Sequence, residues 1–170
     1  MQFHFEIVRS IFGNFFILDS KQGLHFILKF NDKKVKEIIK HYNPNKGLFN
    51  KSISNLFKNL TLGKKNFSKI KIKFLYGTIL QKIVWKKLLK IKYGTIISYS
   101  DLALQTPYPN AIRAVASAVG KNPISVIVPC HRVVRKDGFL GNYAWGAKMK
   151  KKLLDLEVCG MADSIYRGGK

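Results

Sequence analysis

Acidic residues are scarce in this chain of 170 residues: nine Asp and Glu stand against 31 Lys and Arg, which gives a formal net charge of +22. So basic a balance is typical of proteins that work on nucleic acids or anionic membranes. No apolar run approaches the roughly 20 residues that a bilayer-spanning helix needs. The first residues also lack the basic and apolar regions of a secretory signal. We therefore expect no membrane partner and a cytoplasmic protein, nuclear if the source is eukaryotic, with reduced thiols.

Cysteine is also rare, since only Cys130 and Cys159 are present, and neither lies in a CxxC pair or beside clustered histidines. Structural zinc sites need several closely spaced Cys or His ligands. Hydrophobic residues make up 46% of the chain and aromatic residues 12%, so a core can form without disulfides or metal. We expect a globular protein with no metal and no cofactor.

The positive charge is uneven, because no acidic residue occurs between Glu37 and Asp101. Residues 99–170 hold eleven Lys and Arg against five acids, so +16 of the total +22 lies in residues 1–98. Such a diffuse field helps any polyanion approach but specifies none, and lysines on ordinary solvated positions would produce the same count. Steep salt dependence of nucleic-acid binding is expected from it.

The first part of the chain has the pattern of a small α/β domain, residues 1–76. Short apolar stretches separated by turn residues indicate a β-meander, and Asn31 or Asp32 can cap a helix running to about His41. After a loop around residues 43–45, strict alternation indicates a half-buried strand at residues 69–74. The three stretches of the meander are residues 3–9, 14–18 and 24–30.

From about Tyr76 the residue pattern changes from short β-forming stretches to helix-forming segments, and we place a domain boundary there. Thr78 is a plausible N-cap for a helix whose apolar residues are Ile79, Ile83 and Leu88 or Leu89. Two later helices joined by a short turn, residues 100–105 and 110–120, suggest a helix-turn-helix. The remaining elements expected are short strands at residues 95–98 and 126–128, a turn at residues 137–138, a closing helix at residues 148–157 and a tail, residues 159–170.

The helix expected at residues 110–120 carries two stripes. Ile112, Val115 and Val119 form one that belongs in the core. Arg113 lies in the other, on a face otherwise made of Ala116, Ser117 and Gly120. Small side chains allow close approach, either to a neighbouring helix or to DNA, and on DNA the guanidinium could enter a groove or replace an unstacked base.

A thiol immediately precedes an imidazole in the segment Val128-Pro129-Cys130-His131-Arg132-Val133. Most buried cysteines are inert, and a thiol of ordinary pKa is only slightly ionised at neutral pH. Adjacent side chains of an extended chain point to opposite sides. Activation of Cys130 by His131 would therefore need a bridging water or a curled backbone, and Arg132 could also lower the pKa of the thiol.

Together these segments resemble the O6-alkylguanine-DNA alkyltransferase family, whose active-site signature is similar to residues 127–133. The resemblance covers residues 77–158, and for residues 1–76 it rests on size and position. It implies an α/β N-terminal domain followed by a mainly α domain with a winged-helix-like helix-turn-helix. The other segments that carry it, in the same order and at the same spacing, are residues 93–99, 101–103, 111–115, 122–123, 141–146 and 153–157.

The resemblance implies a DNA repair protein that flips a nucleotide out of double-stranded DNA and is consumed in one turnover. Cys130 would accept the alkyl group, with His131 as base through a water, Glu157 orienting His131, and Tyr99 giving a proton to the departing guanine. The carbonyls of Cys130 and Val133 would read the exocyclic amine of guanine. DNA contacts would come from Arg113, Ala114, Ala116 and Ser117, and the base pocket from Asn122, Val133, Tyr143, Ala144 and Trp145.

Two alternatives remain open at this point, a damage-recognition protein without transfer activity and a sequence-specific helix-turn-helix regulator. Ala116 and Ser117 stand where many relatives have Gly, and Ala144 stands where many bacterial relatives have Arg, which affects lesion preference more than the chemistry. Some relatives hold zinc in the N-terminal domain, but no cysteine precedes Cys130 here. We expect a monomer that acts on O6-alkylguanine, and O4-alkylthymine is left open as a second substrate.

Overall fold

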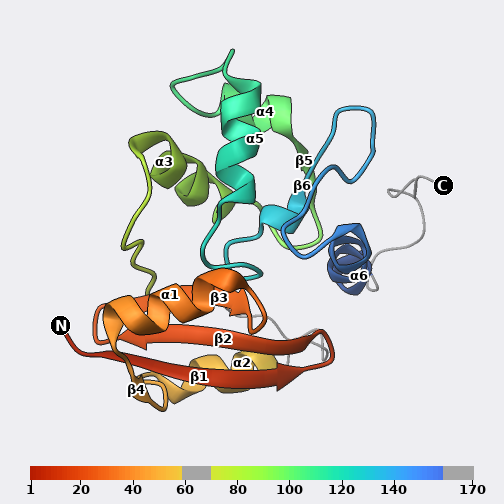
Figure 1. Ribbon diagram of the computed structural model, residues 1–170. Coiled ribbons are helices and arrows are strands. Elements are labelled where there is room, and N and C mark those ends of the chain that lie inside the picture. Colours follow the sequence, from red (N-terminus) through yellow and green to blue (C-terminus); the bar gives the residue numbers. More distant parts are fainter. Residues whose placement is uncertain (59–69, 159–170) are drawn as a thin grey trace. The chain divides into compact units, whose positions relative to one another are not determined.

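The computed structural model describes residues 1–58 and 70–158, and the chain divides into two compact units (Figure 1). The first unit comprises Met1–Leu75 together with Pro123–Ser125, and the second comprises Tyr76–Asn122 and the chain from Val126 onward. The sequence pattern changes at the same place, although nothing in it predicted that Pro123–Ser125 would join the first unit. Within the described ranges, no helix is long and apolar enough to cross a membrane.

The first unit is built on a four-stranded sheet of order β3-β2-β1-β4. Strands β1 (Phe3–Ser10), β2 (Gly13–Ser20) and β3 (Gly23–Lys29) pair antiparallel with their neighbours, which confirms the predicted meander. The two-residue strand β4 (Asn45–Lys46) pairs parallel with β1, where a loop was expected. The sheet is therefore mixed.

Two helices complete the described part of this unit, α1 (Lys33–Tyr42) and α2 (Lys51–Lys58). Asp32 caps α1 by accepting the Lys34 N–H, as expected for an N-cap carboxylate. A core cluster joins the apolar face of α1 to the sheet. Alternate residues of the strands point to this face, and residues three or four apart on the helix pack against them. Its buried members are Phe16, Leu18, Phe26, Leu28, Val35 and Ile38.

The prediction of a strand at residues 69–74 is wrong for the part that the structure describes. Residues 70–75 form only one isolated parallel bridge, between Leu24 and Ile72. Leu24 donates its N–H to the Lys71 carbonyl at 2.8 Å and accepts the Lys73 N–H at 3.0 Å. Pairing stops after this one residue. The alternation therefore reflected an edge segment beside β3 and not a full strand.

The second unit begins with α3 (Ile79–Leu88), whose Thr78 forms a capping box with Gln81. The buried face of the helix matches the expected one only in part: Leu88 is buried as expected, but Ile79 is 76% exposed. Val84 and Trp85 are buried instead. Ile79 is the first residue of the helix, and the buried residues lie in its later turns. Trp85 donates its indole N–H to the Ala118 carbonyl at 2.8 Å, which ties α3 to α5 (Ile112–Gly120).

The remaining elements of the second unit surround a two-stranded parallel sheet of β5 (Ile97–Ser98) and β6 (Val133–Val134). Helix α4 (Tyr99–Leu104) follows β5 directly and lies beside α5, and α6 (Ala147–Val158) closes the described chain (Figure 1). On α5, Val115 and Val119 are buried as expected. Ile112 is exposed, because it starts the helix before the packed turns.

The strand expected at Val126–Val128 is absent. All three residues are buried, but Val126 has a φ of 75° and the chain turns there. A β-branched residue rarely adopts this left-handed conformation, and it is incompatible with a continuous strand. The apolar run indicated burial correctly but not backbone conformation.

Gly77 is a position where backbone geometry demands glycine. Its φ is 111°, and an added Cβ would lie 2.6 Å from the buried ring of Trp85. We expect Gly77→Ala to lower the free energy of unfolding by about 2 to 4 kcal/mol, measured by urea denaturation. Gly138→Ala is the matched control, because Gly138 has a φ of 84° with open space around it. That variant should lose only about 1 kcal/mol, and equal losses would contradict the steric contact.

Candidate active site

Cys130 opens a single 3₁₀ turn, Cys130–Arg132, between a buried loop and β6. The Cys130 N–H donates to the Val128 carbonyl at 2.8 Å, and the Arg132 N–H donates to the Pro129 carbonyl at 3.0 Å. The backbone is therefore curled, and the argument from an extended chain does not apply here. Cys130 is only 5% exposed.

The thiol is held by Asn122, which is itself buried and follows the C-cap residue Lys121 of α5. One amide nitrogen of Asn122 donates to the Val128 carbonyl at 2.8 Å and to the Cys130 sulfur at 3.1 Å. A side-chain NH₂ group has two hydrogens, so both bonds can be made at once. Asn122 thus fixes the loop before the thiol and stabilises negative charge on sulfur.

Burial raises the pKa of the Cys130 thiol, while the Asn122 hydrogen bond and the nearby Lys150 ammonium oppose the rise. The thiol is consequently protonated at neutral pH. A thiol in this state is a weak nucleophile, because the thiolate is the reactive form. The site must therefore supply a base.

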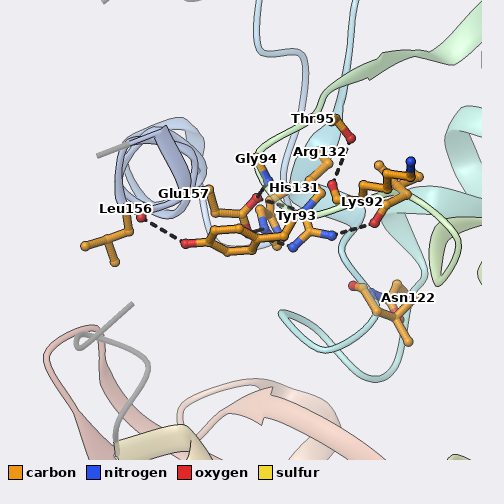
Figure 2. Close-up of polar contacts among 11 residues, drawn as sticks. Lys92, Tyr93, Gly94, Thr95, Asn122, His131, Arg132, Leu156 and Glu157 are labelled. Carbon is orange, nitrogen blue, oxygen red and sulfur yellow. Dashed lines mark hydrogen bonds and ion pairs between the residues drawn. The ribbon is translucent and has the colours of Figure 1, made fainter. Parts of the chain in front are cut away.

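Figure 2 shows a polar cluster next to the 3₁₀ turn, in which Glu157 of α6 contacts both His131 and Arg132. The His131 Nε2 lies 2.8 Å from Oε1 of Glu157. Arg132 donates to both carboxylate oxygens, at 2.7 Å and 3.0 Å. Because a carboxylate only accepts, Nε2 carries the hydrogen and Nδ1 is the basic nitrogen of a neutral imidazole.

Glu157 is ionised at all ordinary pH values. Burial alone would raise its pKa, but the hydrogen bonds from His131 and Arg132 hold the pKa of Glu157 at about 2. The Gly94 N–H adds a weaker bond at 3.3 Å. A permanent negative charge 2.8 Å from the imidazole stabilises the imidazolium form, so His131 is suited to take up a proton.

Arg132 is a site residue whose role the sequence did not reveal. The sequence suggested that Arg132 could lower the pKa of the Cys130 thiol. Its guanidinium instead donates to Glu157 and to the Ile91 carbonyl, each at 2.7 Å. It also lies over the Tyr93 ring, 5.4 Å from the ring centre, and Tyr93 donates to the Leu156 carbonyl (Figure 2). These contacts fix α6 against the turn that carries the thiol.

Lys148, Lys150, Lys151 and Lys152 have the sequence pattern of a solvated helix face, so the sequence predicts solvent exposure for all four. Lys150 is instead 0% exposed, and burial lowers its pKa to about 8. Its ammonium donates to the carbonyls of Val133 and Leu140. The only signal in the sequence was its helical spacing from the buried Leu153 and Leu154.

A hollow of about 590 Å³ opens on the second unit, bounded by α5, Tyr99 and the loop at residues 141–144. Tyr99, Tyr143 and Ala144 line it, as do Ala116 and Ser117 of α5. Burial and the neighbouring Cys130 charge raise the pKa of both tyrosines, that of Tyr143 especially, so both phenols stay protonated.

Other predicted pocket residues are buried and do not line the hollow. Asn122, Val133 and Trp145 are buried, and Trp145 packs edge-on against the Tyr143 ring. The carbonyls of Cys130 and Val133 already accept hydrogen bonds, from the Val133 N–H and from Lys150 respectively. Each carbonyl oxygen keeps a second lone pair. Arg113 and Ala114 are exposed on α5 outside the lining of the hollow.

Within residues 1–58 and 70–158, no group of three or more His, Cys, Asp or Glu side chains is arranged to hold a metal ion. Cys159 lies outside the described residues, as does the segment expected as a tail.

Comparison with known proteins places this geometry in a family. Residues 79–159 match the model of the 6-O-methylguanine DNA methyltransferase DNA-binding domain. The chain is 36% identical over 154 residues to a methylated-DNA–protein-cysteine methyltransferase of Methanosarcina barkeri, covering 91% of this chain and 96% of that protein. It also matches the regulatory protein Ada of Salmonella typhimurium, at 47% identity over 84 residues, but spans only 24% of that longer protein and 49% of itself.

Solved structures agree over almost the whole chain. The O6-methylguanine methyltransferase of Mycobacterium tuberculosis is 30% identical, with a TM-score of 0.82 and coverage of 96% of this chain and 97% of that one. A structure titled as the OGT of the same organism in complex with DNA is 30% identical with a TM-score of 0.78, covering 92% of each chain. The matches extend through both units, so the chain belongs to the methylated-DNA–protein-cysteine methyltransferase family.

Proposed function

We propose that this protein repairs DNA by moving an alkyl group from O6 of guanine to the sulfur of Cys130. The observation that carries the proposal is a buried thiol, held by Asn122, followed in the same 3₁₀ turn by a histidine whose Nε2 is fixed by Glu157. The relatives named as methylated-DNA–protein-cysteine methyltransferases support the same reaction. A thioether is not displaced under mild conditions, so each molecule acts once.

The proposed transfer begins with removal of the thiol proton, through a water, by the basic Nδ1 of His131. The ionised Glu157 stabilises the imidazolium that forms. The thiolate then attacks the alkyl carbon, a carbon–sulfur bond forms, and the carbon–oxygen bond to guanine breaks. In the overall balance the thiol proton replaces the alkyl group on guanine, which leaves as a neutral base.

Tyr99 is the proposed donor of the proton that guanine needs as it departs. It lines the hollow, and its raised pKa keeps the phenol protonated until the base requires the proton. In the structure its hydroxyl donates weakly to the Asn142 carbonyl, at 3.4 Å. A bond this long is readily exchanged for one to a ligand. The proton held on His131 can restore the phenol after transfer.

The proposed DNA surface is the exposed face of α5, with α4 and α5 forming a winged-helix-like helix-turn-helix. The small side chains of Ala116 and Ser117 allow DNA to approach the helix backbone closely, and Arg113 is an exposed cation on the same helix. The target atom lies inside the base stack, so the nucleotide must be extruded at a cost of a few kcal/mol. Arg113 would fill the gap, and the hollow beside Tyr99 would receive the base.

Two other functions are disfavoured by particular residues. A damage-recognition protein has no need for a thiol fixed by Asn122, and Cys130 provides one. A sequence-specific regulator needs several long polar side chains on its recognition helix, whereas the exposed stripe of α5 offers Arg113 beside small residues. We propose that the protein acts as a monomer on double-stranded DNA.

A titration of duplex DNA containing O6-methylguanine tests the proposal. We expect repair of one lesion per protein molecule, after which added substrate stays methylated, because the acceptor is consumed. Loss of O6-methylguanine is followed by chromatography of the hydrolysed DNA. Repair beyond one equivalent would show turnover, and binding without any loss of the lesion would favour damage recognition alone.

A further inference from the structure

A hollow of about 440 Å³ in the first unit has three lysines in its lining, Lys21, Lys51 and Lys71. All three side chains are exposed. They come from three separate segments: the β2–β3 turn, the start of α2 and the segment that bridges to β3. Among the described residues that line the hollow, none is acidic. Three lysines around one hollow create a positive potential that favours an anion.

An exposed aromatic ring stands at the same place. Phe49 is 55% exposed, and it lines both this hollow and a neighbouring one of about 390 Å³. Lys21 is also shared by the two linings. A cation beside an exposed ring is the combination that single-stranded nucleic acids bind, with phosphates on the lysines and a base stacked on the ring.

The backbone that presents Phe49 is fixed by Asp19 of β2. The two carboxylate oxygens of Asp19 accept the N–H groups of Phe49 and Asn50, at 2.9 Å and 2.7 Å. Asp19 is completely buried. Its two carboxylate oxygens are therefore engaged by these N–H groups, which fixes the backbone that presents the Phe49 ring.

The segments that carry the lysines are held as well. Asn50 accepts the Ser52 N–H at 3.1 Å and so fixes the first turn of α2, which Lys51 begins. The Lys71 carbonyl accepts the Leu24 N–H at 2.8 Å. In the β2–β3 turn, the Gln22 N–H donates to the Ser20 hydroxyl at 3.0 Å. The ring and the three ammonium groups are thus presented by an ordered backbone.

We propose that this face of the first unit is a second nucleic-acid site, which binds an unpaired strand with its phosphates at Lys21, Lys51 and Lys71 and a base on Phe49. The site is formed without any residue of the second unit. It goes beyond alkyl transfer and does not depend on it, since neither Cys130 nor an alkylated base takes part. If the site exists, part of the large positive charge of residues 1–98 serves a specific binding site and not only a diffuse field.

Photocrosslinking of the full chain locates the site. The probe is an undamaged oligothymidylate in which one thymine is replaced by 5-iodouracil, a base that crosslinks to aromatic rings stacked on it. After irradiation and digestion, we expect a crosslinked peptide that contains Phe49. Crosslinks confined to residues 76–158 would overturn the proposal, because the strand would then bind only the second unit.

Two triple variants separate a local site from a general field. Lys21→Gln, Lys51→Gln and Lys71→Gln together should weaken oligothymidylate binding at least tenfold and reduce the slope of log affinity against log salt by about 2. Lys33→Gln, Lys34→Gln and Lys36→Gln remove the same charge from exposed positions of α1 in the same unit. These control changes should have less than a threefold effect. Equal losses in the two triples would show a diffuse field and contradict the site.

The ring is tested by two substitutions of similar bulk. Phe49→Leu keeps an apolar side chain but removes the aromatic face, and it should weaken binding about tenfold. Phe49→Trp keeps the face and should bind as well as the parent chain or better. Urea denaturation checks that each variant is folded. Unchanged binding by the folded Phe49→Leu protein would exclude stacking on this residue.

Discussion

A Cys130→Ser protein is expected to lose alkyl transfer by at least about 10³-fold while its affinity for duplex DNA changes less than twofold. A hydroxyl is a far weaker nucleophile than a thiol, and even a well-placed imidazole seldom ionises it. Serine still accepts the Asn122 hydrogen bond that the sulfur accepts at 3.1 Å, so the loop should remain in place. Transfer is measured by single-turnover loss of O6-methylguanine, and binding by fluorescence anisotropy.

The matched control for this change is Cys159→Ser, which removes the other thiol of the chain. We expect normal transfer from it. Transfer retained by the Cys130→Ser protein and lost by the Cys159→Ser protein would reassign the acceptor to Cys159 and overturn the site described here.

Glu157→Gln is the second change with a large expected effect, because it leaves the buried Arg132 guanidinium without its carboxylate. Breaking a buried ion pair by removing one partner typically costs about 3 to 5 kcal/mol of unfolding free energy. His131 also loses the acceptor that orients it at 2.8 Å. We expect a loss of about 3 kcal/mol or more at pH 7 in urea denaturation, together with transfer at least tenfold slower.

The pH dependence of this loss identifies its origin. The folded pKa of Glu157 is about 2, below the ordinary value of 4.5. A lowered carboxyl pKa stabilises the fold fully above pH 4.5, and that contribution disappears as the pH falls towards 2. The stability curves of the parent and Glu157→Gln proteins should therefore converge across this range. A difference that stays constant with pH would mean that packing, and not charge, is responsible.

A double variant isolates the pair. Arg132→Met combined with Glu157→Gln removes both charges, so no unpaired ion stays buried. We expect it to be more stable than Glu157→Gln alone, because hydrophobic replacement of a whole buried pair is often nearly neutral. Additive losses would indicate that the two residues act independently, contrary to their contacts at 2.7 Å and 3.0 Å.

Local signals in the sequence predicted much of the fold. The meander of β1 to β3 follows from short apolar stretches separated by turns, and the start of α3 follows from Thr78, because an N-cap is decided by neighbouring residues. Val126 shows the limit of such reasoning. Its apolar neighbours indicated a strand, but burial in the complete fold imposed a φ of 75° that no propensity predicts.

The site was predictable where chemistry is concentrated in one segment and less so where it depends on distant partners. The segment around Cys130 pointed to the thiol and the imidazole. Arg132 was not assigned to Glu157, because the two residues meet only when α6 packs on the 3₁₀ turn. Lys150 was assigned to solvent, because three neighbouring lysines concealed the one whose position on α6 faces the interior.

Mass spectrometry of the Cys130 peptide, after incubation with duplex DNA containing O6-methylguanine, tests the central claim most directly. The account predicts that this peptide gains the mass of one methyl group, that the gain reaches one equivalent per protein, and that the DNA loses an equal amount of the lesion. An unmodified Cys130 peptide in a sample whose lesion has been repaired would contradict it.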